Sequence, residues 1–121
     1  MVLFLTLVAA VVWMQLPTAG YSTDLSRVGQ GRPALVLAFD SNFTGGMGVM
    51  ELMNDIRDDY EGRVHFLVAH LATPQAREFA SRHGAADGTV LLFAGNGERI
   101  GTLHQPQSAE ELRQALRPLL R

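Results

Sequence analysis

The side chains that could do chemistry in this sequence are methionines, histidines and hydroxyl residues, because the chain contains no cysteine. Met47, Met50 and Met53 are spaced by three, and thioethers at such a spacing suit a soft ion such as Cu(I). Met53 also belongs to an apolar stripe with helical period, and methionine is a common filler of protein cores. We expect packing to explain the three methionines and predict no bound metal or cofactor; a Cu(I) or other small-ligand site is the alternative.

The four histidines give no clear metal-binding pattern. No pair has the i, i+4 spacing of a helical metal site. His70 ends a predicted buried strand, at the end of the sheet where α/β proteins tend to bind ligands. We expect a solvated or hydrogen-bonded strand-end residue there, with a role in a site as the alternative. The other three are His65, His83 and His104.

Composition removes several classes of function. The 121 residues carry twelve acids against ten bases, a net charge of −2, and all ten bases are arginine. Cysteine-ligated metals, thiol nucleophiles, Schiff-base lysines and the lysine of a P-loop are therefore impossible. A near-neutral chain without a basic block also has no footprint for nucleic acid. The abundance of Arg, Ala and Gly without Lys is typical of GC-rich coding and hints at a bacterial source.

The first 23 residues contain no ionisable side chain, and the first one is Asp24. The apolar run at 2–16 is shorter than the roughly 17 residues that the shortest membrane spans need, and it fits the core of a secretory signal. The absence of a basic residue before the run is atypical of a signal peptide. Trp13 stands late in the run, where a membrane anchor places an interfacial aromatic residue. We expect 1–20 to be a signal peptide or a short membrane anchor. A buried strand or helix at the N-terminus is the third alternative. Residues 21–31 should be a linker or a short helix. The rest would then lie outside the cytoplasm, secreted or periplasmic, or attached to the inner membrane.

Hydrophobic patterning from residue 32 onward alternates between strands and helices. Short apolar runs bounded by turn formers predict buried strands, and apolar residues with a 3.6-residue period predict helices. A Thr-Pro pair, a Ser-x-x-Glu box and a Gly-Asn-Gly turn mark two helix starts and a hairpin. The predicted strands are Ala34–Phe39, Val64–Ala69, Val90–Ala94 and Arg99–Leu103, and the predicted helices are 49–62, 73–83 and 108–119.

This order predicts the architecture. The first two strands, joined by a helix, should be parallel with a right-handed crossover, whereas the hairpin makes the last two antiparallel. The fold class is therefore α/β, a three-layer α/β/α sandwich with a mixed sheet formed by residues 32–121.

Four stretches taken in order resemble the thioredoxin family. They are ALVLAF at 34–39, GVMELMNDIRDDYEGRV at 48–64, the stretch from Gly84 through LLFAGNGE at 84–98, and SAEELRQAL at 108–116. The resemblance extends over 32–121 with almost no gaps. It implies a thioredoxin-like fold whose redox motif would follow the first strand.

The residues that carry the family's redox chemistry are absent from this sequence. Counting from the strand puts Thr44 and Met47 at the two cysteine positions, and counting from the helix puts Phe43 and Gly46 there. The position of the family's cis-proline is Thr89, where a trans bond is expected because a cis bond before another residue costs about 2.5–4 kcal/mol. The family's buried acid would be Leu37 or Ala38. Dithiol–disulfide exchange needs a thiolate, so this chain cannot perform it with its own residues.

A thioredoxin-like scaffold without its reactive groups leads us to expect a non-catalytic protein-interaction or assembly module. Its partner-binding surface would replace the family's polypeptide-binding surface, with Phe43 and Met47 exposed for apolar contacts. The alternatives are the Cu(I) or small-ligand protein and a glutathione-dependent enzyme that uses the hydroxyl of Ser41 or Thr44. The predicted binding residues are Phe43, Thr44, Gly45, Gly46, Met47 and Thr89.

Overall fold

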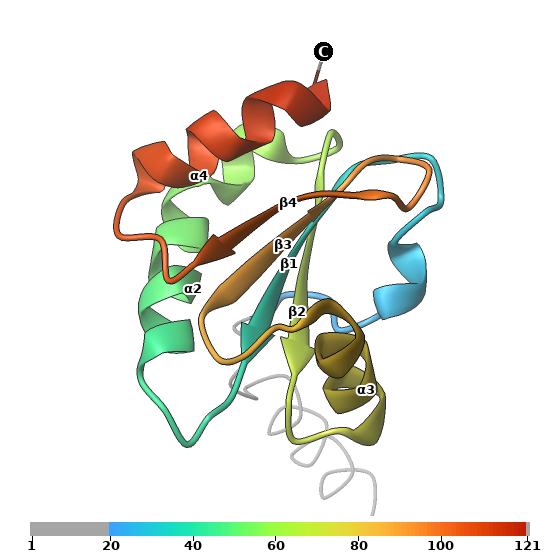
Figure 1. The fold of residues 1–121 in the computed structure, drawn as a ribbon. Coiled ribbons are helices and arrows are strands. Elements are labelled where there is room, and N and C mark those ends of the chain that lie inside the picture. Colours follow the sequence, from blue (N-terminus) through green and yellow to red (C-terminus); the bar gives the residue numbers. More distant parts are fainter. Residues whose placement is uncertain (1–19, 121) are drawn as a thin grey trace, which may run out of the picture.

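Four strands form one mixed sheet in the computed structural model, which describes residues 20–120 (Figure 1). The order across the sheet is β2-β1-β3-β4. β1 pairs in parallel with β2 and antiparallel with β3, and β4 pairs antiparallel with β3. The strands are β1 (Ala34–Phe39), β2 (His65–His70), β3 (Thr89–Phe93) and β4 (Arg99–His104).

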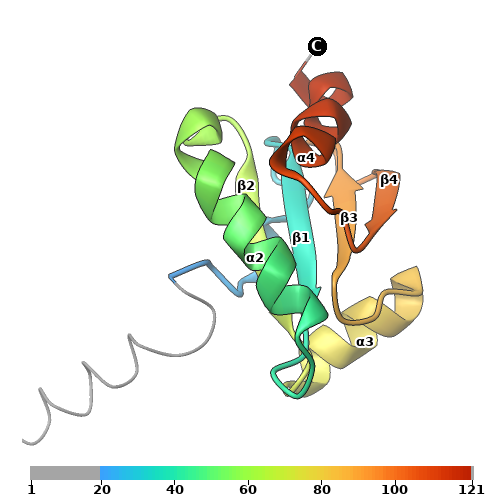
Figure 2. The ribbon, with the colours of Figure 1, turned by 90° about the vertical axis from the view of Figure 1, so that its left-hand side faces the viewer.

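Helices cover both faces of the sheet and make three layers. α2 and α4 lie on one face, and α3 lies on the other with the short 3-10 helix η1 (Figures 1 and 2). The predicted three-layer sandwich and its order of elements are thus confirmed. The helices are η1 (Leu25–Arg27), α2 (Gly45–Ile56), η2 (Arg57–Tyr60), α3 (Pro74–His83), α4 (Ala109–Leu116) and η3 (Arg117–Leu120).

The alternation of side chains along β1 builds both halves of the core, because successive residues of a strand face opposite sides. Leu35, Leu37 and Phe39 pack under α2 and α4. Ala34 and Val36 face α3 and its Phe79. Every residue of β1 is buried, as the continuous apolar run predicts.

The helix boundaries follow the chemistry seen in the sequence. The Thr73 hydroxyl accepts the N–H of Ala76 at the start of α3, and Ser108 accepts the N–H of Glu111 at the start of α4. Gly84 ends α3 in the left-handed conformation, with φ of +64°.

The helix α2, the first of the three predicted helices, differs from the prediction at both ends. α2 begins at Gly45, four residues before the predicted start at Val49, and the α-helix ends at Ile56, with η2 continuing to Tyr60. Three glycines and one methionine, a poor helical sequence, thus form the first turn. A side chain from a distant loop, described below, stabilises this turn.

The segment before β1 packs against the domain. Tyr21 is buried among the residues of the α2 face, and its hydroxyl donates to Asn54 Oδ1 at 2.7 Å. Ser22 forms a parallel bridge with Leu67 on the outer side of β2. The predicted leader, 1–20, lies outside the described residues except for its last one. Within 20–120, none of the helices has the length and hydropathy needed to cross a bilayer.

Candidate functional site

The loop between β1 and α2, together with the first turn of α2, presents two apolar side chains to solvent. The side chain of Phe43 is 60% exposed and that of Met47 is 53% exposed. The predicted exposure of both residues is confirmed. Only Ile100, on β4, is a further large hydrophobic residue with comparable exposure in the described part of the chain. The loop lies at the carboxyl end of β1, the end at which α/β sheets usually bind ligands.

A carboxylate from the turn before β3 holds this loop. Asp87 Oδ1 accepts the N–H of Asp40 at 2.8 Å, and Asp87 Oδ2 accepts the N–H of Gly46 at 2.9 Å. The first bond fixes the start of the loop and the second fixes the first turn of α2. The N-cap residue Thr44 makes no side-chain cap of its own, so Asp87 satisfies a helix N–H that would otherwise lack a partner.

The electrostatics of this contact also favour a carboxylate. The N-terminus of a helix carries a partial positive charge, and an anion placed there is stabilised. In this chain Asp87 supplies that anion from within the fold. The same end of a helix lowers the pKa of a thiol and makes it reactive, but the first turn of α2 contains only glycine and methionine.

Glycines make the close approach of Asp87 possible. A Cβ on Gly46 would collide with Asp87 Oδ1 and stand 3.0 Å from the ring of Phe39. A Cβ on Gly45 would collide with the side-chain amide of Gln105. Gly88, next to Asp87, has φ of +87°, a conformation that glycine adopts without strain.

Gln105 covers the other side of this cluster. Its φ is +47°, the only positive φ of a non-glycine residue within the described part of the chain. Its N–H donates to the carbonyl oxygen of Gly88 at 3.1 Å, and its carbonyl oxygen accepts the side chain of Gln107 at 2.8 Å. Backbone strain of this kind persists where the surrounding structure enforces it, often at binding sites.

The predicted binding residues fall into two groups. Phe43, Thr44 and Met47 are exposed, and Gly45 is half-buried beside them. Gly46 and Thr89 are buried, and the hydroxyl of Thr89 accepts the N–H of Ala86 at 3.1 Å. The expected trans bond before Thr89 is confirmed, since no peptide bond is cis between residues 20 and 120.

The three methionines are not displayed on one surface. Met50 and Met53 belong to the core beneath α2, and only Met47 is exposed. No group of three or more His, Asp or Glu side chains in the described residues is arranged to hold a metal ion. Ser41 and Thr44, the candidate hydroxyls, are both exposed.

His70 is more enclosed than the sequence suggests. Its ring stacks on Phe39 with centroids 5.6 Å apart. Its Nε2 is buried and has no hydrogen-bond partner among the described residues. The expected solvated or hydrogen-bonded ring is thus not found at Nε2.

Asp87 and Gln105 are the residues of this site that the sequence did not reveal. The Asp87-Gly88 pair is a turn signal, and a turn residue is usually read as solvated. Nothing local indicates that its carboxylate reaches a loop more than 40 residues away. The useful signal is the unusual density of glycine at 45, 46, 48 and 88, which marks close backbone approach.

Comparisons with known proteins support the architecture. No protein-family model matches the sequence, and comparison with curated protein sequences finds no significant match. Among solved structures, the chain is similar to a thioredoxin from Thermus thermophilus, with a TM-score of 0.65 and 17% identity. The match covers 82% of this chain and 85% of that one. The protein therefore has a thioredoxin-like fold, and it carries that fold without a single cysteine.

Proposed function

We propose that this chain is a redox-inactive protein-interaction module that binds an apolar segment of a partner through Phe43 and Met47. The observation that carries the proposal is the exposure of these two side chains on one loop and helix turn held by Asp87. Exposed large apolar side chains gathered at one place commonly contact another molecule. Without cysteine, the contact cannot involve a disulfide or a thiol of this chain.

The fixed geometry of the loop supports binding. The two hydrogen bonds to Asp87 define where the loop begins and where α2 starts. A surface already held in shape loses little conformational entropy when a partner docks, so more of the contact energy appears as affinity. The buried positions of Gly46 and Thr89 assign them a supporting role, while Phe43, Thr44 and Met47 make the contacts.

The proposed place of action is outside the cytoplasm. The apolar run at 2–16 and the absence of ionisable side chains before Asp24 support export or anchoring. A domain without cysteine forms no disulfide bonds, so an oxidising compartment does not change its covalent structure.

The experiment is photo-crosslinking from defined positions of the full-length protein in its own cell. A photoreactive phenylalanine analogue replaces Phe43 in one variant and Ile100 in the other. Ile100 is the matched control because it is 45% exposed and lies on β4. We expect a discrete crosslinked product from position 43, unchanged by reducing agent, and none from position 100. Equal crosslinking from both positions, or none from 43, would contradict the proposal.

Substitution tests the energetic contribution of the same side chains. Truncating an apolar anchor at the centre of an interface costs about 2 kcal/mol or more, which corresponds to roughly 30-fold in affinity. In this experiment a photoreactive residue replaces Thr44 and reports the amount of crosslinked partner. The double variant Phe43→Ser, Met47→Ser should lower that amount. Ile100→Ser should leave that amount unchanged.

A further inference from the structure

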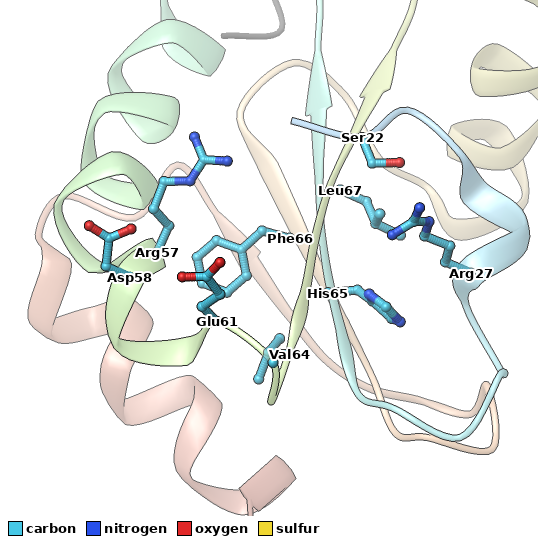
Figure 3. Close-up of a pocket in the computed structure, with 10 residues that line it drawn as sticks. Ser22, Arg27, Arg57, Asp58, Glu61, Val64, His65, Phe66 and Leu67 are labelled. Carbon is cyan, nitrogen blue, oxygen red and sulfur yellow. The ribbon is translucent and has the colours of Figure 1, made fainter. Parts of the chain in front are cut away.

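A pocket of about 410 Å³ lies along the outer edge of β2, the edge that faces away from β1 (Figure 3). It surrounds the first residues of the strand, whereas the Phe43 loop follows the carboxyl end of the neighbouring parallel strand β1. The pocket and the loop therefore belong to opposite ends of the sheet. The lining residues are Ser22, Arg27, Arg57, Asp58, Glu61, Gly62, Val64, His65, Phe66 and Leu67.

The backbone of β2 is paired at this edge only through the bridge between Leu67 and Ser22, among the described residues. The N–H of His65 donates inward, to Pro33 beside β1, and the N–H of Val68 donates outward, to Ser22. Because backbone groups alternate along a strand, the N–H of Phe66 has the same outward direction as that of Val68 and faces the pocket. The bridge is parallel, so residues before Ser22 would continue the pairing toward the start of β2, but no hydrogen bond joins Gly20 or Tyr21 to Phe66.

The two walls of the pocket stand on opposite faces of the sheet and differ in charge. One wall lies on the α2 face of the sheet. Asp58, in η2, and Glu61, in the turn after η2, belong to this wall, and both are exposed. Arg57 is on the same wall, with its guanidinium stacked 3.9 Å from the ring centroid of Tyr21. Figure 3 shows Asp58, Glu61 and Arg57 on one side of the strand, and Arg27 and His65 on the other.

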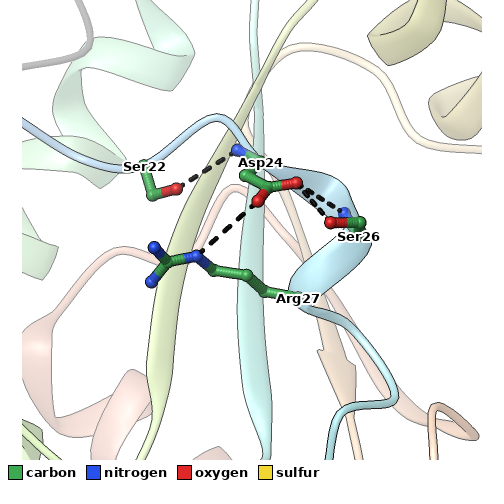
Figure 4. Close-up of polar contacts among 4 residues, drawn as sticks. All are labelled: Ser22, Asp24, Ser26 and Arg27. Carbon is green, nitrogen blue, oxygen red and sulfur yellow. Dashed lines mark hydrogen bonds and ion pairs between the residues drawn. The ribbon is translucent and has the colours of Figure 1, made fainter.

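The wall formed by η1 is basic. The Nε of Arg27 lies 3.9 Å from Oδ2 of Asp24, and the carboxylate of Asp24 also accepts hydrogen bonds from Ser26 (Figure 4). Both members of this ion pair are about half exposed, so the pair is weak and can exchange partners. Burial lowers the pKa of His65, and the neighbouring Arg32 and Arg27 lower it further, which reflects the positive potential on this side.

We propose that the β2 edge binds an extended peptide segment of a partner in which a basic residue and an acidic residue are adjacent. The added strand pairs with the outward N–H of Phe66, as in other cases of strand addition to an open sheet edge. Its successive side chains point to opposite faces. The basic one therefore meets Asp58 and Glu61, and the acidic one meets Arg27 and His65.

The test uses labelled hexapeptides and the full-length protein in mild detergent. Thr-Val-Arg-Glu-Val-Thr places the two charges on opposite faces of a strand. Thr-Arg-Val-Glu-Val-Thr has the same composition but places both charges on one face. Fluorescence anisotropy should show tighter binding of the first peptide, by about two- to fivefold, the range expected for one exposed ion pair. Equal affinity of the two peptides, or no binding of either, overturns the proposal.

Variants then locate the site. Arg27→Gln and Glu61→Gln should each lower the affinity for the first peptide by about two- to fivefold, because each removes one exposed ion pair. Arg82→Gln and Glu78→Gln, matched changes at exposed positions of α3, should not. Hydrogen exchange should slow at the amide of Phe66 when peptide is bound. Slowing confined to the Phe43 loop, or loss of peptide binding in the Phe43→Ser, Met47→Ser variant, would contradict a separate site.

Discussion

The backbone N–H of Gly46 donates to the carboxylate of Asp87 across 2.9 Å, although 41 residues of sequence separate the two. This contact makes the turn before β3 part of the loop that follows β1. It also gives α2 a cap that does not come from its own sequence. The candidate binding surface therefore depends on a residue that lies beside it in space and far from it along the chain.

The first prediction concerns this carboxylate. Asp87→Asn removes the charge at the helix N-terminus and leaves one of the two N–H groups without an oxygen acceptor. The free energy of unfolding should fall by about 1.5–3 kcal/mol, the usual range for a hydrogen bond to a charged group. Urea denaturation measures it. Asp55→Asn, on the exposed side of α2, is the control and should change stability little.

The second prediction separates two glycines of the same helix. Gly46→Ala forces a methyl group against Asp87 and should destabilise the protein and open the loop. Gly48→Ala meets no atom within 4 Å. Because alanine is the better helix former, this control should stabilise the protein by about 0.5–1 kcal/mol. Thermal unfolding of the two variants should move in opposite directions, and a shift in the same direction would disprove the role assigned to Gly46.

The third prediction concerns His70, whose buried Nε2 has no partner in the described part of the chain. A buried polar atom without a hydrogen bond costs about 1–3 kcal/mol, and an apolar group of similar shape avoids that cost. His70→Phe, which preserves the stack on Phe39, should therefore leave stability unchanged or raise it. Chemical denaturation is the measurement. A clear loss of stability would contradict this prediction.

The fourth prediction is a dependence on alkaline pH. Burial raises the pKa of Tyr21 above its ordinary value of 10.0, and the positive charge of Arg57 offsets part of that rise. The unfolded chain therefore ionises this phenol first, so its contribution to stability is complete below pH 10 and is lost as pH rises through the folded pKa. Denaturant titrations from pH 9 upward should show the loss. Tyr21→Phe should abolish it, whereas Tyr60→Phe, which retains Tyr21, should keep it.

Much of the fold was predictable because its signals are local. The continuous apolar run of β1, the Thr73-Pro74 start of α3 and the Ser108 box of α4 each specify an element within a few residues. The start of α2 was not predictable in this way. Its first turn has a poor helical sequence and forms where Asp87, from another loop, satisfies its N–H.

The candidate site was predictable only in its apolar half. Phe43 and Met47 stand between turn-forming residues, and a loop exposes such side chains. Thr89 was expected at the binding surface because it occupies the position of the thioredoxin family's cis-proline, but in the fold its side chain turns inward to accept the N–H of Ala86. The β2 pocket depends on how η1 and η2 flank one strand, which no sequence pattern indicates.

Tyr21 gives the chain a fixed point of attachment at the start of the domain. Its ring is buried and its hydroxyl is bound to Asn54, so the backbone at this residue moves with α2. A force applied to the backbone at Tyr21 would therefore be transmitted to α2, the helix that carries Met47.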